Sequence, residues 1–464
     1  MITLEEILKI KYKDKLKIDK ILLRKFDGIS IDSRNIGKNE LFVAIKGEST
    51  DGHNYIKDVF AKGVKLAIVE KNWFIKNKNI FKNNSFLIVE NSVKALGELA
   101  GIYRHKFYIP LLAVSGSNGK TTTKDLLAAV LSKKYMVLNT EANFNNHIGV
   151  PITLFRLDSS YDFIVLEIGS NHFGELQYLC SFAEPDFGLV TNIGREHLEF
   201  FKNVQGAAKE ELTLFDYLRE SGNKPCFLNY DDTYVRNYAR KFKLNNSFSY
   251  SYKYDTDVNG KFLGFNKNFN PRINVSGVNF DFDFTVSTFG MHSVYNGLAA
   301  ACAGIYFGVS NTKIQNALSN FKEQSQNRMN VTEFNNVKII NDAYNSNPDS
   351  VKLGLETMKM YRTKGKIHLV LSDMLEMGKN GRRLHFEVGE LAKKMKFENI
   401  YTYGENAFQI FKGAKGIQNN FYFKDKIDLS EFLKVIVKPD DAVYIKGSRG
   451  MKMEDVVNYL NNTK

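Results

Sequence analysis

The sequence lacks any apolar run long enough to cross a membrane: a spanning helix needs roughly 20 consecutive hydrophobic residues, and no run approaches that length. Its first six residues include two glutamates, where a secretory signal would have basic residues followed by an apolar segment. Cysteine is scarce as well. Cys180, Cys226 and Cys302 lie far apart in apolar surroundings, without a Cys-x-x-Cys spacing. We therefore expect a cytoplasmic protein without membrane contact, with buried reduced thiols and neither disulfides nor a zinc site.

Acidic residues are few relative to basic ones, which gives the chain a formal net charge of +13 at pH 7. A basic domain of this kind can bind nucleic acid through its phosphates. Here the lysines are spread along the whole length, and clusters such as residues 9–13 are interrupted by apolar side chains. We therefore favour a solvated, lysine-rich surface and expect no nucleic-acid partner. A positive field also attracts acidic substrates such as nucleotides.

The 464 residues are too many for one hydrophobic core, so the chain is expected to form several domains. Strand and helix patterns divide it into three blocks, residues 1–106, 107–327 and 328–464. Each block combines short apolar strands with helices, and the last has βα units of its own, as in a Rossmann-like domain. The fold class that we predict is therefore α/β, with three domains.

The central block is predicted to contain a parallel sheet. Its candidate strands include residues 163–168 and 187–192, which are near-continuous apolar runs followed by polar residues. That pattern is typical of buried parallel strands with helices on both faces, and ligands of such sheets bind beyond the carboxyl ends of the strands. One long polar stretch, residues 251–276, is typical of a hairpin-rich insertion.

The most informative segment is an apolar strand at residues 109–114 that runs into a glycine-containing turn and then a helix near Thr122. Such a turn directs backbone N–H groups and the positive end of a helix dipole at one spot, where phosphate binds. Val114 stands where the usual G-x-x-x-x-G-K-[ST] has glycine, so the match is to a shorter G-x-x-G-K-T; the alternative is a chance loop that caps a helix. The sequence predicts an ATP site in which Lys120 reaches the β- and γ-phosphates and Thr121 binds Mg²⁺. The residues of this phosphate loop are Gly116, Ser117, Asn118, Gly119, Lys120, Thr121 and Thr122.

Polar residues follow several strands of the central block. Glu167 ends one candidate strand, His197 follows the next, and Asp231 and Asp232 follow another. A Mg²⁺ ion shared with ATP phosphates needs one or two carboxylates and keeps several waters, so Thr121 with Glu167 would suffice. Each residue alone is more typical of a surface acid or of a hydrogen-bonded structural histidine. Their place at successive strand ends beside a phosphate loop favours a catalytic site.

Several motifs resemble those of the Mur ligases, ATP-dependent enzymes that form amide bonds in peptidoglycan synthesis, and the resemblance spans essentially the whole chain. The motifs are the short phosphate loop and the runs TEANFNNHIGVP (140–151), GMHSVYN (290–296) and NDAYNSNPDS (341–350). The first block, with DSR at 32–34 and LFVAIKGE at 41–48, is similar to the UDP-binding domain of the family. By this resemblance, the residues that contact the UDP-linked substrate are Ser33, Arg34, Asn145 and Asn146.

The resemblance also implies metal chemistry that spacing alone does not indicate. Lys209 lies in a segment that by itself predicts a solvated helix lysine. In the family, a lysine here carries CO₂ as a carbamate that ligates a second Mg²⁺, aided by a histidine that matches His197. A carbamate turns an ammonium into an oxygen ligand that suits Mg²⁺. The implied metal ligands are Thr121, Glu167, His197 and carbamylated Lys209, and the last three of these, with Lys120, are the implied catalytic residues.

Other family residues match positions near the nucleotide. Asn296 is implied as a contact to the base, although Ser293 stands where the family usually has asparagine. Arg328 matches an arginine near the domain junction that contacts ATP phosphate, and Asp342 matches a contact to the ribose.

The stretch 341–350 is similar to the signature of the branch of the family that adds a dipeptide. By this resemblance Tyr344, Asn345 and Asn347 lie near the incoming D-alanyl-D-alanine. The asparagines are also typical of a turn before Pro348, and the two roles are compatible.

The resemblance thus implies a monomeric ATP-dependent ligase that adds D-alanyl-D-alanine to UDP-N-acetylmuramoyl-tripeptide. An acyl phosphate forms on the way, and the step is the last cytoplasmic one toward the muramoyl pentapeptide. Two alternatives stay open: a sister ligase of the Mur or folylpolyglutamate type that adds one amino acid, and a basic P-loop ATPase that nucleic acid stimulates. The stretch 341–350 argues against the first, and the absence of a helicase-like motif set argues against the second.

Overall fold

The computed structural model describes residues 1–11, 13–17, 25–322 and 329–461. It divides into two compact units, one of residues 1–113, 135–169 and 174–187, and one of residues 114–134, 170–173 and 188–464. This division crosses strand β8 (Leu111–Ser115) and does not follow the three predicted domains. The domain boundaries therefore stay a prediction, and the second of them lies outside the described residues.

The first part of the chain forms a small sheet with helices packed on it. Its elements are β1 (Ile2–Thr3), α1 (Leu4–Ile7), β2 (Lys13–Lys17), β3 (Lys25–Phe26), β4 (Ile29–Ser30), β5 (Leu41–Val43), η1 (Gly52–Tyr55), α2 (Ile56–Ala61), β6 (Ala67–Glu70), α3 (Lys71–Asn77), β7 (Phe86–Val89) and α4 (Ser92–Arg104). The strand order is β2-β7-β6-β5-β4, parallel except for β2. Helix α4 confirms the helical pattern at 92–103, and Asn91 caps it by accepting a hydrogen bond from the Lys94 N–H.

The middle part contains a nine-stranded sheet with the order β16-β15-β14-β13-β12-β11-β8-β10-β9. Its further strands are β9 (Val137–Asn139), β10 (Phe163–Glu167), β11 (Phe187–Val190), β12 (Cys226–Asn229), β13 (Ser247–Ser251), β14 (Val258–Phe265), β15 (Pro271–Gly277) and β16 (Phe280–Thr285). Its helices are α5 (Lys120–Leu131), α6 (Gly149–Leu154), α7 (Glu175–Ala183), α8 (Leu198–Phe201), α9 (Val204–Glu211), α10 (Thr213–Glu220), α11 (Thr233–Phe242), α12 (His292–Tyr306) and α13 (Asn311–Ser319).

The pairing in this sheet changes along it. Strands β9 and β10 are parallel, and so are β11 to β14 in succession, for example with Cys226 opposite Ser247 in β12 and β13. The parallel pairing agrees with the buried, apolar strands that the sequence predicts. Strands β14, β15 and β16 instead form an antiparallel meander, and the predicted hairpin-rich insertion is found in this meander.

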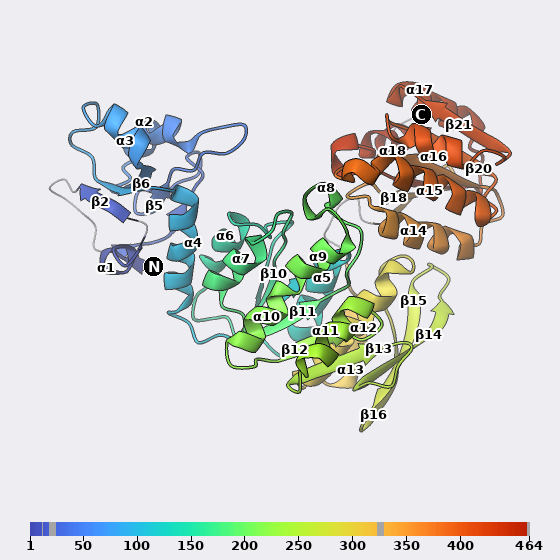
Figure 1. Cartoon of the computed structure of the whole chain (residues 1–464), viewed down its shortest axis with the longest axis horizontal. Coiled ribbons are helices and arrows are strands. Elements are labelled where there is room, and N and C mark those ends of the chain that lie inside the picture. The colour runs from blue at the N-terminus through green and yellow to red at the C-terminus, as the bar shows by residue number, and fades with distance from the viewer. Residues whose placement is uncertain (12, 18–24, 323–328, 462–464) are drawn as a thin grey trace. The chain divides into compact units, whose positions relative to one another are not determined.

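The last part of the chain is a six-stranded sheet with the order β17-β18-β22-β19-β20-β21, in which only β17 is antiparallel to its neighbour. Its elements are β17 (Asn330–Phe334), β18 (Val337–Asp342), α14 (Pro348–Met360), β19 (Ile367–Ser372), η2 (Gly378–Asn380), α15 (Gly381–Lys394), β20 (Asn399–Tyr403), α16 (Ala407–Gly413), β21 (Asn419–Phe423), α17 (Lys426–Ile436), β22 (Ala442–Lys446), η3 (Arg449–Met451) and α18 (Glu454–Asn461). Leucines, isoleucines and valines of α14, α15 and α16 pack on one face, and those of α17 and α18 pack on the other (Figure 1). Two hydrophobic cores therefore enclose the strands, as in a Rossmann-like layer.

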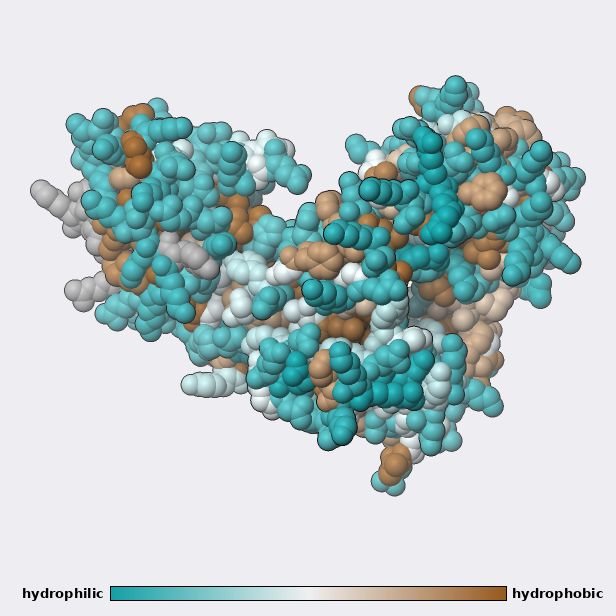
Figure 2. Space-filling model, viewed as in Figure 1, coloured by the Kyte–Doolittle hydropathy of each residue, from teal (hydrophilic) through white to brown (hydrophobic). Residues whose placement is uncertain are grey.

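The surface and the cysteines agree with the composition. The face seen in Figure 2 is mostly hydrophilic, with hydrophobic residues scattered over it. Cys180, Cys226 and Cys302 are buried, as the sequence predicts, and burial raises the pKa of the Cys226 thiol to about 12. Among the described helices, none has the length and apolar character of a membrane span.

One buried carboxylate lies where the central strands β19 and β22 of the last sheet begin. Asp441 accepts hydrogen bonds from the backbone N–H groups of Lys366 at 2.6 Å and Lys438 at 2.8 Å, and Nε2 of His368 lies 3.0 Å from its Oδ2. Burial alone would raise the pKa of Asp441, but these hydrogen bonds outweigh it and hold the pKa below the ordinary 3.8. Stability that comes from a carboxylate with a lowered pKa is complete above the ordinary pKa, and it is lost as the pH falls through the lowered value.

We expect Asp441→Asn to lower the free energy of unfolding by about 2 kcal/mol at pH 7, because an amide NH₂ in place of one oxygen leaves buried donors unpaired. The loss should shrink in acid, because the contribution of the carboxylate declines as the pH falls below the ordinary 3.8 and toward the lowered pKa. Urea unfolding at pH 7 and pH 3 measures both effects, with the exposed Asp428→Asn as the control. A loss of the same size at both pH values would contradict this account.

Candidate active site

The phosphate loop joins β8 to α5, and the helix begins at Lys120, slightly before the predicted start near Thr122. Gly116 and Gly119 have φ angles of +117° and +81°, the left-handed region that favours glycine. A Cβ on Gly119 would lie 2.5 Å from Oδ1 of Asn296. The backbone conformation and the close packing of this turn therefore require glycine, as the motif predicts.

The loop is tied to the segment that follows β11. Thr191 Oγ1 and Asn192 Nδ2 both donate to the carbonyl oxygen of Asn118 at 2.8 Å. The Ser117 N–H donates to the Asn192 carbonyl at 2.8 Å, and Ser117 Oγ accepts from the Gly194 N–H at 2.7 Å. These bonds fix the loop from one side by contacts within the protein.

Lys120, the predicted phosphate-binding lysine, folds back over the loop. Its Nζ donates to the Gly116 carbonyl and forms a 3.3 Å ion pair with Oε2 of Glu196. The side chains of Lys120 and Glu196 are 15% and 3% exposed, so the pair is largely shielded from water. Thr121, which is buried, and the half-buried Thr122 follow in the first turn of α5.

Glu211 lies beneath the loop, at the end of α9. Its Oε2 accepts hydrogen bonds from the Ser115 hydroxyl and from the Gly116 N–H, the latter at 2.6 Å, and the side chain is fully buried. Burial raises the pKa of the Glu211 carboxyl; the charge of Lys120 opposes this rise and that of Glu196 adds to it. Two buried carboxylates therefore flank one lysine, and no sequence motif pointed to either of them.

Asn296, the predicted contact to the base, lies against the phosphate loop. It belongs to α12, it is buried, and its Oδ1 accepts a hydrogen bond from Thr123 Oγ1 at 3.2 Å. The same amide lies next to Gly119. Asn296 thus supports the start of α5, and its contact to the base stays a prediction.

His197 and Lys209 lie at the two ends of one aromatic cluster. The ring of His197 lies 6.1 Å from that of Phe201, Phe201 lies 5.3 Å from Phe173, and Lys209 Nζ lies 6.0 Å from the Phe173 ring. Lys209 is exposed, as the sequence predicts for a helix lysine, and among the described residues it forms no salt bridge.

His197 also contacts the loop that follows β19. Its Nδ1 hydrogen-bonds to Oε2 of Glu376, and this bond lowers the pKa of the Glu376 carboxyl. The backbone of His197 has a φ of +46°, uncommon for a residue with a Cβ. The His197 ring is therefore held by Glu376 and by its contact to the Phe201 ring. Glu376 is a site residue that the sequence interpretation missed.

A second bridge joins the same segment to helix α14. The backbone N–H of Arg195 donates to Asp349 at 2.7 Å, and its guanidinium donates twice to the other oxygen, at 3.0 and 2.7 Å. Asn347 Nδ2 donates to Oδ1 of Asn118 at 2.9 Å. The predicted dipeptide signature and the phosphate loop are thus in direct contact.

Asn347 has a structural role as well. Its Oδ1 accepts from the Ser350 N–H at 2.8 Å, its own N–H donates to Ser350 Oγ, and Pro348 occupies the first turn of α14. This capping box confirms the turn that the sequence allows before Pro348.

The other predicted residues of this stretch surround a buried lysine. Lys446 Nζ donates to Oδ2 of Asp342 at 2.7 Å and to the Asn345 carbonyl at 3.0 Å, and the Tyr444 hydroxyl donates to Asp342 at 2.8 Å. The guanidinium of Arg449 lies 5.5 Å from the Tyr344 ring. Oδ2 of Asp342 is therefore engaged within the protein, and the contact of Asp342 to the ribose stays a prediction.

Glu167 is held at the end of β10 in the first unit. Asn145 Nδ2 donates to its Oε1 at 2.7 Å, while its Oε2 is buried without a hydrogen-bond partner. A buried carboxylate oxygen with no donor suits a Mg²⁺ ligand, so this residue fits the ion that the sequence predicts. Over the described residues, no group of three or more His, Cys, Asp or Glu side chains is arranged to hold a metal.

The remaining predicted residues have local partners. Asn146 Oδ1 accepts from the Ile148 and Gly149 N–H groups at 3.0 and 2.9 Å and so begins α6. Arg34 is exposed and pairs with Asp32 at 2.9 Å, and the Ser33 carbonyl accepts from Lys62 at 2.8 Å. Arg328 lies outside the described residues.

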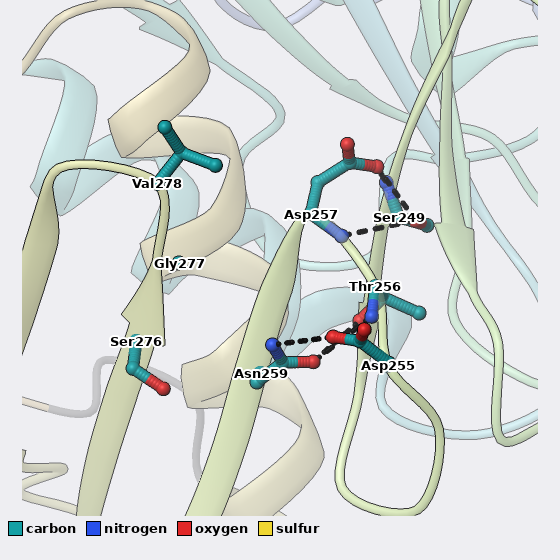
Figure 3. Close-up of a pocket in the computed structure, with 8 residues that line it drawn as sticks. All are labelled: Ser249, Asp255, Thr256, Asp257, Asn259, Ser276, Gly277 and Val278. Carbon is teal, nitrogen blue, oxygen red and sulfur yellow. Dashed lines mark hydrogen bonds between the residues drawn. The ribbon is translucent and has the colours of Figure 1, made fainter.

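A separate pocket of about 630 Å³ opens beside the antiparallel meander (Figure 3). Its polar groups bond to one another: Asp257 accepts from the Ser249 N–H and hydroxyl, and Asn259 Nδ2 donates to Asp255 at 3.1 Å. None of the predicted site residues lines it. The lining residues are Ser249, Asp255, Thr256, Asp257, Asn259, Ser276, Gly277 and Val278.

The fold and these contacts agree with a known family. The chain matches the Mur ligase family catalytic domain over residues 25–104, the Mur ligase middle domain over 114–304 and the Mur ligase glutamate ligase domain over 327–449. The chain therefore belongs to the Mur ligase family, as its motifs predict.

Individual relatives match along nearly the whole length. The UDP-N-acetylmuramoyl-tripeptide--D-alanyl-D-alanine ligase of Bacillus subtilis (strain 168) is 32% identical over 93% of both chains. The MurF ligase of Thermotoga maritima, solved in complex with ADP, is 25% identical with a TM-score of 0.82 over 94% of this chain and 97% of the other. MurF from Acinetobacter baumannii, 24% identical, has a TM-score of 0.89 over 99% of both chains and confirms the α/β fold.

We expect Gly119→Ala to weaken ATP binding strongly, because its Cβ would displace Asn296 from the loop. Gly174→Ala is the matched control. Gly174 also lies directly before a helix and has a positive φ of +88°, but a Cβ on Gly174 would have no neighbouring atom within 4 Å. Both variants should lose about 1–2 kcal/mol of stability from the left-handed backbone. Calorimetric titration with ATP and urea unfolding separate the two effects, and equal ATP affinity in both variants would contradict the assignment.

Proposed function

We propose that this chain is an ATP-dependent ligase that joins D-alanyl-D-alanine to UDP-N-acetylmuramoyl-tripeptide. The observation that carries the proposal is the hydrogen bond between Asn347, in the stretch that resembles the dipeptide-adding branch, and Asn118 of the phosphate loop. A dipeptide held by that stretch would have its amine next to the activated carboxyl group beside the γ-phosphate. The named activity of the relative from B. subtilis is the same.

The reaction would proceed in two transfers. A carboxylate oxygen of the tripeptide attacks the γ-phosphorus of ATP and ADP leaves, which gives an acyl phosphate. The dipeptide amine then attacks the acyl carbon, inorganic phosphate leaves and the amine loses a proton. Lys120 stabilises the charge on the transferred phosphoryl group. Water would hydrolyse the acyl phosphate, so the bonds from Arg195 to Asp349 and from Asn347 to Asn118 serve to hold the site closed.

The three blocks would divide the substrates among them. We assign the UDP-linked acceptor to residues 1–106, where Ser33 and Arg34 lie, and to Asn145 and Asn146. ATP belongs to residues 107–327, and D-alanyl-D-alanine belongs to residues 328–464. ATP and a nucleotide-linked acceptor are both metabolites of the cell interior, so we place the reaction in the cytoplasm.

We assign Mg²⁺ as the cofactor, because hydroxyl, carboxylate and carbamate oxygens are the ligands that this ion takes. Thr121, Glu167, His197 and a carbamate on Lys209 would hold two ions, whose charge would neutralise the phosphate oxygens. The exposure of Lys209 leaves its amine accessible to CO₂. The hydrogen bond that His197 Nδ1 donates to Glu376 would fix the ring so that the other ring nitrogen is free to contact an ion.

The direct test measures phosphate release from ATP with UDP-N-acetylmuramoyl-tripeptide, with and without D-alanyl-D-alanine. We expect release to require both substrates and the product mass to increase by the dipeptide less one water. Dependence on a single free amino acid would instead assign a sister ligase. Stimulation by DNA or RNA without any peptide dependence would overturn the proposal.

The carbamate has its own test. We expect Lys209→Ala to reduce kcat by at least about tenfold. The variant would lose an ion that stabilises the charge developing in the transition state by several kcal/mol. Added short carboxylates should restore part of the activity by supplying the missing oxygen ligand. The exposed Lys202→Ala is the control and should leave kcat unchanged. If no carboxylate restores activity, Lys209 does not carry a carbamate.

The dipeptide contact is tested at Asn347 by a variant that keeps the helix cap. Asn347→Ser retains an oxygen for the Ser350 N–H but removes the amide that reaches Asn118. We expect the KM for D-alanyl-D-alanine to increase by about tenfold, which corresponds to the loss of one polar contact of ~1.4 kcal/mol. The free energy of unfolding should change little. Steady-state kinetics and thermal unfolding report the two quantities. A variant with wild-type KM would limit Asn347 to capping.

A further inference from the structure

The lysine of the phosphate loop already has an anionic partner. Lys120 Nζ lies 3.3 Å from Oε2 of Glu196, and the Glu196 side chain is only 3% exposed. The second oxygen of Glu196, Oε1, is buried without a hydrogen-bond partner. A carboxylate that is shielded from water and bonded through one oxygen gains little from the pairing, because desolvation offsets most of the attraction. The ion pair between Lys120 and Glu196 therefore adds little to the free energy of unfolding.

The position of the pair suggests another role. The loop, the start of α5 and Lys120 together form the place where a nucleotide phosphate would bind. A phosphate oxygen needs the same ammonium that Glu196 now holds. The Lys120 ammonium cannot keep its 3.3 Å contact to Glu196 and also turn to a phosphate oxygen over the loop, so binding requires the ion pair to open.

The neighbours of Glu196 determine which partner moves. Arg195 is bonded through its backbone and its guanidinium to Asp349, and His197 is bonded to Glu376. Glu196 is thus fixed between two anchored residues. Lys120 has a flexible four-carbon side chain, so the ammonium is the group that changes partners.

We infer that Glu196 is a positioning residue that occupies the place of a nucleotide phosphate: it holds the Lys120 side chain over the loop until an ATP phosphate takes its place. The inference rests on the proposed binding of ATP at this loop. Its consequence is an affinity for ATP and ADP lower than the loop alone would give. After turnover, Glu196 takes Lys120 back and so favours the release of ADP.

The test is Glu196→Gln, which keeps the shape of the side chain and removes its charge. We expect the Kd for ATP and for ADP, measured by calorimetric titration, to decrease by about tenfold, the range for a hydrogen bond to a charged group. The KM for ATP should fall with them, while kcat should not rise. Glu199→Gln removes a charge from an exposed residue three positions further on and should leave the Kd for ATP unchanged. Weaker or equal ATP binding by Glu196→Gln would overturn the inference.

A double-mutant cycle with Lys120→Met shows whether the effect acts through the lysine. In that background, Glu196→Gln should change the Kd for ATP by less than about twofold. An equal gain with and without Lys120 would mean a general effect of negative charge and would overturn the inference. Glu196→Asp, which keeps the charge on a shorter side chain, should also tighten ATP binding, and it carries the test if the glutamine variant does not fold. If the wild-type protein binds neither ATP nor ADP, the proposed ATP site is wrong. If the wild-type protein binds ATP and Glu196→Gln does not bind it more tightly, only the role inferred for Glu196 is wrong.

Discussion

The carboxylate of Glu211 is the contact on which the arrangement of this site depends. It accepts from the Ser115 hydroxyl and the Gly116 N–H, and so joins the end of helix α9 to the point where strand β8 becomes the phosphate loop. The group is fully buried, and an unpaired N–H or hydroxyl in its place would cost about 1–3 kcal/mol. The turn at Gly116 is therefore held by contacts within the protein itself. Lys209 belongs to the same helix, so the loop and the predicted carbamate share one rigid support.

The segment after β11 connects this support to the last sheet. Thr191 and Asn192 bond to the loop, whereas Arg195 and His197 bond to α14 and to Glu376. One short stretch of chain thus contacts the nucleotide side and the proposed dipeptide side.

Patterns within one strand or turn were sufficient to predict much of this protein. The buried strands, the helix at 92–103 and the glycines of the phosphate loop follow from local rules of burial and backbone conformation. The resemblance to the Mur ligases was confirmed by the family models. Glu196, Glu211 and Glu376 were missed, because each acquires its role from a partner distant in the sequence. Spacing along the chain carries no signal for a carboxylate that meets a backbone N–H 95 residues away.

The double use of Asn347 limits how this protein can evolve. One atom of its amide begins helix α14 and another reaches the phosphate loop, so most substitutions would remove both contacts at once. Selection for a different amine substrate would therefore meet a folding penalty at this position before any gain in activity appears. A protein of this branch that takes another amine substrate should therefore differ at other positions of the stretch 341–350 and keep Asn347.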